Sequence, residues 1–298
     1  MIRPPKLVAG DLVAIVATAR SVDQQSMRSA AELIRRWGLE VTFGPHLFEV
    51  KDQFAGEDQS RIADLQWALN KPEVKAILCA RGGYGTTRII DEINFKTLMS
   101  QPKWICGFSD ITAISCHLHK HQIESIHGTM PLLFERAGHE ASRESLRKLL
   151  FGEVTRLEVT THEFNQPGIA SGALVGGNLS ILVHLIGTPS ELDTINKILF
   201  IEDIDEYLYH VDRMMLQLLR AGKLNGLAGL VVGQMTDMND NKVPFGKTAY
   251  EIIRSHVESF NYPVAFGLPI GHDKPNIALP VGRTAKLMVA SEGAQLSF

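Results

Sequence analysis

A serine, Ser109, stands in the segment Gly107-Phe108-Ser109-Asp110, between an apolar run over residues 104–107 and a helical pattern. A strand that turns directly into a helix presents the intervening side chain beside helix N-terminal amides, which can hold an oxyanion. The segment is therefore compatible with a nucleophilic serine. The match to Gly-x-Ser-x-Gly is incomplete, because Ile111 stands where the second glycine is expected. Serine is also a preferred helix N-cap, and on this motif alone the capping role is the simpler interpretation.

A glycine-rich segment, Arg81-Gly82-Gly83-Tyr84-Gly85, follows an apolar run over residues 74–80. Glycines let main-chain amides approach a ligand closely, so the segment could cradle a phosphate or stabilise an oxyanion. It lacks the Gly-Lys-Ser/Thr ending of a P-loop and the Gly-x-Gly-x-x-Gly spacing of a dinucleotide site. An ordinary strand-to-helix turn would use glycines in the same way.

Two polar residues follow apolar segments in the second half of the chain. Glu202 closes the apolar run over residues 198–201, and His272 follows Pro269-Ile270-Gly271. A carboxylate at the end of a buried strand can orient an imidazole, as in a catalytic triad. A solvated strand end for Glu202 and a loop position for His272 are the alternatives.

Several histidines are close enough in sequence to suggest a metal site. On a helix, His117 and His121 share a face, whereas His119 points elsewhere, and His127 lies farther on. No glutamate completes a His-Glu-x-x-His pattern. A polar helix face explains these residues, so we predict neither a metal nor a cofactor.

Hydrophobic periodicity places these residues on elements. Apolar runs predict strands over residues 12–17, 39–43, 74–80 and 104–107, and helical spacing predicts helices over residues 23–37, 57–70, 87–93 and 110–121. Farther along, helices over residues 178–186, 210–220 and 248–260 alternate with strands over residues 198–201, 227–233 and 263–268. This alternation predicts an α/β fold with a mostly parallel sheet covered by helices on both faces.

The pattern changes around the turn cluster at residues 165–168. We therefore expect an N-terminal α/β domain over residues 1–150, a linker over residues 151–170 and a smaller C-terminal α/β domain over residues 171–298. A chain of 298 residues is long enough for this division.

Composition limits the class of protein. Hydrophobic residues make up 45% of the chain, and the net charge of −3 argues against a nucleic-acid partner. No apolar run is long enough for a bilayer span or a signal peptide. Cys79, Cys106 and Cys116 lie in apolar segments and are predicted to be buried thiols. We expect a cytoplasmic globular protein without a membrane partner.

Several ordered motifs resemble those of one family, the LD-carboxypeptidases, which are serine peptidases also called muramoyltetrapeptide carboxypeptidases. The similarity runs from near Gly10 to near Gly282, essentially the whole chain. The segments that carry it are residues 56–65, 76–85, 107–112, 199–203 with Tyr209 and 212–218, 267–272 and 279–282.

The resemblance implies roles for individual residues. Ser109 is expected to be the nucleophile, His272 the general base and acid, and Glu202 the group that orients His272. The oxyanion hole is expected to use the amides of Asp110 and Gly83, with Gly82 as the other candidate.

The resemblance also implies a fold and a substrate. A Rossmann-like N-terminal domain would carry the serine, the C-terminal domain would carry the other two residues, and the active site would lie in the cleft between them. The substrate would be a muramoyl tetrapeptide of cell-wall turnover and recycling, cut before its terminal D-alanine. Arg81 and Tyr84 are candidate substrate contacts, and the family suggests a homodimer.

Three other functions remain open from the sequence. A microcin-immunity peptidase of the same family would use the same triad on a peptidyl-nucleotide and would need an aromatic platform for the base. A non-catalytic Rossmann-like protein could bind a ligand at residues 81–85. A cysteine hydrolase using Cys106 fits less well, because Cys106 lies within the predicted strand.

Overall fold

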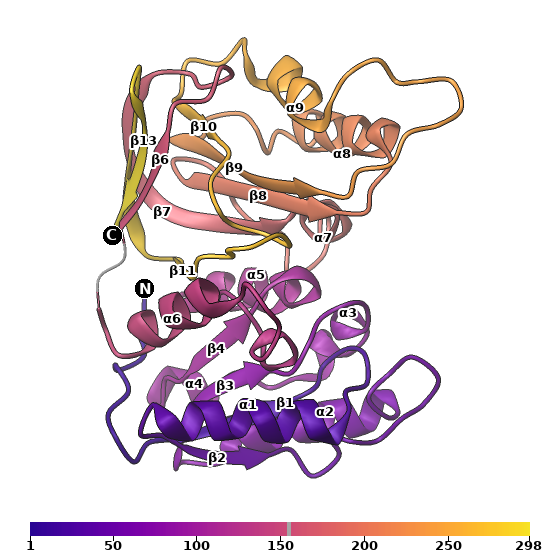
Figure 1. The fold of residues 1–298 in the computed structure, drawn as a ribbon, viewed down its shortest axis with the longest axis vertical. Helices are drawn as coiled ribbons and strands as arrows, with labels where there is room; N and C mark the ends of the chain where they lie inside the picture. The colour runs from indigo at the N-terminus through magenta and orange to yellow at the C-terminus, as the bar shows by residue number, and fades with distance from the viewer. Residues whose placement is uncertain (154–155) are drawn as a thin grey trace. The chain divides into compact units, whose positions relative to one another are not determined.

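The computed structural model describes residues 1–153 and 156–298, which form two compact units (Figure 1). The first unit contains residues 1–153 together with Pro275–Val281, and the second contains residues 156–274 and Gly282–Phe298. Within the predicted linker, Val154 and Thr155 lie outside the described residues, and residues 156–160 form a strand.

The first unit is built around one mainly parallel sheet. Its strands are β1 (Leu12–Val16), β2 (Glu40–Phe43), β3 (Val74–Cys79), β4 (Trp104–Gly107), β5 (Ser125–His127) and β11 (Leu279–Val281). They lie in the order β11-β5-β4-β3-β1-β2, and only β11 pairs in the antiparallel direction. The predicted α/β fold with a mostly parallel sheet is confirmed for this unit.

Helices follow most of these strands. They are α1 (Gln24–Arg36), α2 (Asp58–Asn70), α3 (Thr86–Ile89), α4 (Thr97–Ser100), α5 (Thr112–Lys120) and α6 (Glu140–Leu150), with short 3-10 turns η1 (Ile90–Glu92), η2 (Ser109–Ile111) and η3 (Pro131–Leu133). The predicted helices at residues 23–37 and 57–70 are confirmed to within one residue at each end. The helix predicted over residues 110–121 begins later, at Thr112, because η2 precedes it.

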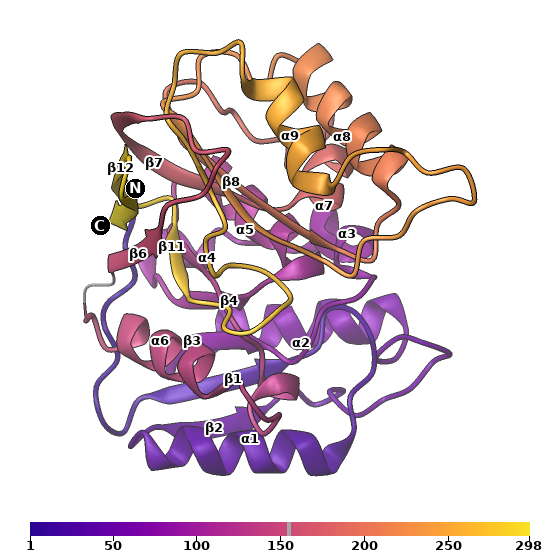
Figure 2. The same ribbon diagram turned by 45° about the horizontal axis from the view of Figure 1, so that its top comes forward.

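One hydrophobic core covers a face of this sheet. Alternate residues of β1 and β3 point into it, such as Val13 and Ile15, and the apolar faces of α1 and α6 pack there (Figures 1 and 2). The buried residues of α2, including Leu65 and Leu69, are not part of that core. Right-handed crossovers from β1 to β2 and from β2 to β3 place α1 and α2 on opposite faces.

The second unit contains a mixed sheet. Its strands are β6 (Arg156–Thr160), β7 (Gly168–Asn178), β8 (Ile198–Ile204), β9 (Gly229–Thr236), β10 (Val264–Phe266), β12 (Thr284–Ala290) and β13 (Gly293–Ser297). The order is β10-β9-β8-β7-β12-β13-β6, parallel from β10 to β7 and antiparallel from β7 to β6. Its helices are α7 (Leu179–His184), α8 (Leu208–Arg220) and α9 (Ala249–Val257).

No helix in the described part of the chain combines the length and apolar character that a membrane span requires. Cys79, Cys106 and Cys116 are buried free thiols, as predicted. Burial raises the pKa of all three thiols, which disfavours a reactive thiolate at Cys106.

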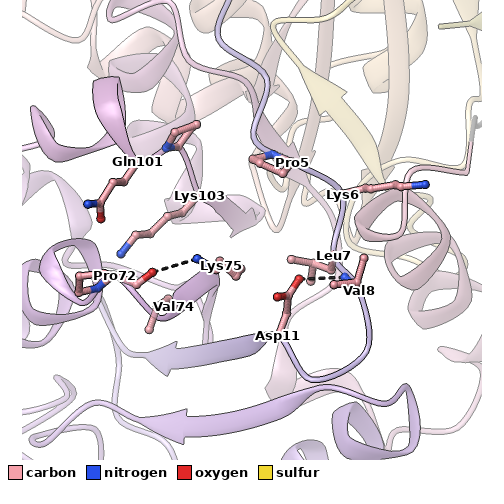
Figure 3. A pocket seen from close by; sticks show the side chains of 11 residues that line it. Pro5, Lys6, Leu7, Val8, Asp11, Pro72, Val74, Lys75, Gln101 and Lys103 are labelled. Carbon is pink, nitrogen blue, oxygen red and sulfur yellow. Dashed lines mark hydrogen bonds between the residues drawn. The ribbon is translucent and has the colours of Figure 1, made fainter.

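A pocket of about 540 Å³ lies at the amino ends of β1 and β3 (Figure 3). Lys103 lines it and is only 2% exposed. Its ammonium group donates to the carbonyls of Ala68 (3.0 Å) and Lys71 (2.5 Å) at the carboxyl end of α2. This bonding explains the buried lysine as a cap of α2.

We predict that Lys103 makes stability depend on pH. Burial, together with the charge of Lys75, lowers the pKa of Lys103 to about 8. An unfolded chain keeps this proton up to about pH 10.4. The unfolded state therefore binds more protons between these values, and this contribution to stability rises with pH. The free energy of unfolding can be measured with urea for wild type and Lys103→Met. The value for wild type minus that for the variant should increase from pH 8 to pH 10. A constant difference would contradict this prediction.

Candidate active site

Ser109 occupies a sharp turn between β4 and α5. Its backbone has φ 62°, in the left-handed region that side chains other than glycine rarely adopt. Such a conformation costs on the order of 1–3 kcal/mol and is often found at functional sites. The geometry is that of the strained turn on which nucleophilic serines are presented.

The capping role for Ser109 is not supported. Phe108 and Ile111 stand at the N-cap positions of η2 and α5, and neither helix start has a side-chain cap hydrogen bond. Ser109 is the first residue of η2 and is partly buried. Its conformation therefore has to be explained by something other than helix capping.

The glycine-rich segment approaches Ser109 closely. A Cβ atom placed on Gly82 would lie 3.2 Å from the Cβ of Ser109 and 3.4 Å from the amide nitrogen of Asp110. Any side chain at this position would crowd the serine. This close approach therefore favours glycine at the position.

The side chain of Asp110 connects the two segments. Its carboxylate accepts a hydrogen bond of 2.9 Å from the amide of Thr86, in the first turn of α3. The hydroxyl of Thr86 lies 2.9 Å from that of Thr18 in the segment after β1. Three segments that follow neighbouring strands are thus held together around Ser109.

The second unit brings Glu202 and His272 together. Glu202 lies on β8 with no solvent exposure, and its Oε2 is 2.7 Å from Nδ1 of His272. Gly271 precedes the histidine with φ 135°, and a Cβ there would lie 3.1 Å from the same carboxylate oxygen. The predicted pairing of a strand-end carboxylate with an imidazole is present in the structure.

Electrostatics favour a charged His272. Burial lowers the pKa of His272, but the charge of Glu202 and their hydrogen bond, with a contribution from Asp203, raise it above the ordinary histidine value. The same carboxylate favours the neutral form of Asp203. Burial and the charge of Glu202 raise the pKa of Asp203 to about 7. Its carboxylate accepts hydrogen bonds from Asn178 (2.7 Å) and the amide of Ser180 (2.9 Å).

Gln234 is a residue that the sequence interpretation missed. The pairing of β8 with β9 shifts at Glu202, because Ile201 pairs with Val232 and Asp203 with Met235. The extra residue on β9 forms a bulge, a feature that commonly re-aims a side chain beside an active site.

This bulge lets Gln234 brace the turn that carries His272. The main-chain amide of Gln234 donates to the carbonyl of Ile270 (2.8 Å). The side-chain oxygen of Gln234 accepts from the main-chain amide of Asp273 (2.9 Å). The histidine is thus held on both sides. A polar residue directly after the apolar strand over residues 227–233 was the available signal.

The remaining candidates lie in the first unit. Arg81 donates to the carbonyl of Ser21 (3.2 Å), and Tyr84 is 45% exposed with its ring 5.9 Å from that of Phe54. Gly83 is exposed beside Gly82.

The histidines of the helix over residues 112–120 and its end lie as follows. His117 and His121 lie on one face of the helix region, with their Nε2 atoms 3.2 Å apart, and His119 is buried. In the part of the chain that the structure describes, no group of three or more His, Cys, Asp or Glu side chains could hold a metal ion.

Comparisons with known proteins show what this chain is similar to. Residues 13–128 match the family model described as LD-carboxypeptidase N-terminal domain, and residues 171–287 match the LD-carboxypeptidase C-terminal domain. A probable murein peptide carboxypeptidase of Bacillus subtilis is 36% identical, and the alignment covers 98% of this chain and 93% of that protein.

Solved structures extend the similarity to the fold. A muramoyltetrapeptide carboxypeptidase from Oxalobacter formigenes is 30% identical with a TM-score of 0.88, covering 96% of this chain and 98% of that one. The microcin C7 self-immunity protein MccF, in complex with aspartyl sulfamoyl adenosine, has a TM-score of 0.87, covering 98% and 97%. At 18% identity, this second match shows a shared fold alone.

We predict that Glu202 controls the protonation of His272. In Glu202→Gln the negative charge is lost while a hydrogen-bonding side chain remains, so the pKa of His272 should fall by about one pH unit or more. NMR titration of the His272 imidazole measures this directly. Glu206→Gln is the matched control, because Glu206 pairs with His210 instead. An unchanged pKa of His272 in Glu202→Gln would contradict the prediction.

Proposed function

Because this chain belongs to the LD-carboxypeptidase family, we propose that it is a serine carboxypeptidase that releases the terminal D-alanine from muramoyl tetrapeptides. The observation that carries the proposal is the left-handed backbone of Ser109 at the end of β4, which the capping alternative does not explain. The Glu202–His272 pair supplies the base that such a serine needs.

The reaction begins with proton transfer from Ser109 to His272. Glu202 holds Nδ1 of the imidazole, so Nε2 is the atom that accepts the serine proton. The serine Oγ then bonds to the carbonyl carbon of the third peptide residue, which has an L-configured centre. The carbonyl electron pair moves to oxygen and forms a tetrahedral oxyanion.

Collapse of this intermediate breaks the carbon–nitrogen bond. His272 returns its proton to the departing nitrogen, and D-alanine leaves with a neutral amine. Water then gives a proton to His272 as it attacks the acyl-enzyme ester. The second intermediate expels Ser109, whose oxygen regains the proton from His272. A tripeptide and the starting enzyme result.

The oxyanion would be held by the amides of Asp110 and Gly83. Close approach of Gly82 to Ser109 supports a donor from this glycine pair, and the bond from Asp110 to Thr86 fixes the segment. Loss of one such donor costs about 10²–10³ in rate in comparable sites. Arg81 and Tyr84 are proposed to contact the substrate beside these amides.

The proposal includes a cellular context. Muramoyl tetrapeptides arise from cell-wall turnover, and we propose that the protein acts on them in the cytoplasm during recycling, as a homodimer. Sedimentation analysis of the purified protein and fractionation of cells test these two parts.

A second candidate is cleavage of a peptidyl-nucleotide. The observation that favours it is an exposed aromatic pair on the second unit, Tyr207 and Tyr209, with ring centroids 5.7 Å apart. The guanidinium of Arg213 lies 5.2 Å from the Tyr209 ring centroid. Such rings could stack on a base. Hydrolysis of an aminoacyl sulfamoyl-adenosine, measured beside the tetrapeptide, distinguishes the two substrates.

We predict that Ser109→Ala abolishes D-alanine release. Removal of a serine nucleophile should lower kcat by about 10⁶. Mass spectrometry of a muramoyl tetrapeptide incubated with wild type should show loss of one alanine, and a chelator should not prevent it. Cys106→Ser is the control for the cysteine alternative and should retain activity.

Two results would contradict the proposed function. Equal release by Ser109→Ala and wild type would exclude the serine mechanism. An intact tetrapeptide after incubation with wild type would exclude the substrate.

A further inference from the structure

The carboxyl ends of β1 and β3 form a topological switch point. These strands are neighbours in the sheet, and the chain leaves β1 toward β2 on one side but leaves β3 toward β4 on the other. Val16 pairs with Cys79, and the amide of Ala80 donates to the carbonyl of Val16 (2.8 Å). The segments that follow therefore diverge from one point, which is where open α/β sheets bind ligands.

Two arginines lie at this point, one on each segment. Arg81 follows β3 and donates through Nη1 to the carbonyl of Ser21 (3.2 Å), which is in the segment after β1. The side chain of Arg20 packs over Gly83, since a Cβ placed on that glycine would lie 2.7 Å from Cδ of Arg20 and 2.9 Å from its Nε.

A third arginine approaches from the segment after η3. The amide of Leu132 donates to the carbonyl of Ala80 (3.1 Å), which holds this segment beside β3. Arg136 follows, with its amide bonded to the carbonyl of Leu133 (3.1 Å). Burial lowers the pKa of Arg81, and repulsion from Arg20 and Arg136 lowers it further. Arg81 therefore lies within electrostatic reach of both other arginines.

Among the described residues of this unit, no carboxylate forms an ion pair with this group. Arg20, Arg81 and Arg136 make no ion pair with any described residue of their unit. Arg61 and Arg88, in contrast, each form an ion pair with Asp58. Like charges gathered without a counter-ion destabilise a fold, and an anionic ligand would relieve the repulsion.

We propose that Arg20, Arg81 and Arg136 bind the free α-carboxylate of the substrate's C-terminal residue and so restrict the enzyme to chain ends. The inference rests on the proposed function. The carboxylate carbon is two bonds from the scissile nitrogen, so its binding site must lie close to the nucleophile. Gly82 joins Arg81 to the neighbourhood of Ser109, since its Cβ position is 3.2 Å from that of the serine.

Binding without turnover tests this proposal. We would measure by calorimetry the Kd of Ser109→Ala for a muramoyl tetrapeptide and for the same peptide with a C-terminal carboxamide. The free acid should bind about 10- to 100-fold more tightly, as expected for charge-assisted hydrogen bonds. Arg81→Gln and Arg20→Gln, each added to Ser109→Ala, should weaken binding of the acid and leave binding of the amide unchanged.

Two further variants separate charge from geometry. Arg81→Lys should keep part of the preference, because lysine supplies the charge without the bidentate geometry. Arg35→Gln, an exposed arginine in the last turn of α1, removes the same charge elsewhere in the unit and should change neither Kd.

Equal Kd values for the acid and the amide would overturn the proposal. Tighter binding of the acid that persists when Arg81→Gln and Arg20→Gln are combined would also overturn it. Rates of hydrolysis of the two peptides are measured separately, with the enzyme that retains Ser109. Hydrolysis of acid and amide at equal rates would overturn the carboxylate site and leave the proposed function. A preference in binding without any hydrolysis would overturn the proposed function and leave the carboxylate site.

Discussion

The hydrogen bond between His272 and the fully buried Glu202 is the interaction on which the polar architecture of the second unit depends. A carboxylate without solvent is costly unless it is paired, so the turn that carries the histidine must come close to β8. The bulge on β9 and the absence of a side chain at Gly271 permit this approach. The same bond raises the pKa of His272 and fixes Nδ1 as the ring nitrogen that Glu202 holds.

In the first unit, the ends of parallel strands hold the strained turn of Ser109 in place. Parallel strands end together at one edge of a sheet, and the segments that leave β1, β3 and β4 are tied together there by the bonds among Thr18, Thr86 and Asp110. Ser109 can keep its strained backbone because these hydrogen bonds hold the surrounding segments in place. The pocket at the opposite, amino ends of β1 and β3 has its buried lysine engaged in capping α2, which accounts for that cation without a ligand.

Elements with strong patterns were predictable from the sequence, and elements without them were not. The strand at β1 and the helix at α1 follow from an apolar run and a clear helical period. Strand β7 was missed because its glycines interrupt the hydrophobic signal, and β5 and β11 have only three residues each. The Glu202–His272 pairing was expected from the family resemblance. The contacts of Gln234 and the grouping of arginines depend on a bulge and on loop contacts, which the strand-end position of Gln234 alone does not reveal.

The proposed mechanism requires that His272 activates Ser109, and the reactivity of the serine measures this most directly. The protein would be treated with a fluorophosphonate, and the modified residue and its rate of modification would be determined by mass spectrometry. The account predicts labelling at Ser109 in wild type and a rate at least about 100-fold lower in His272→Ala, because the general base is lost. Labelling at another residue, or an equal rate in both proteins, would contradict it.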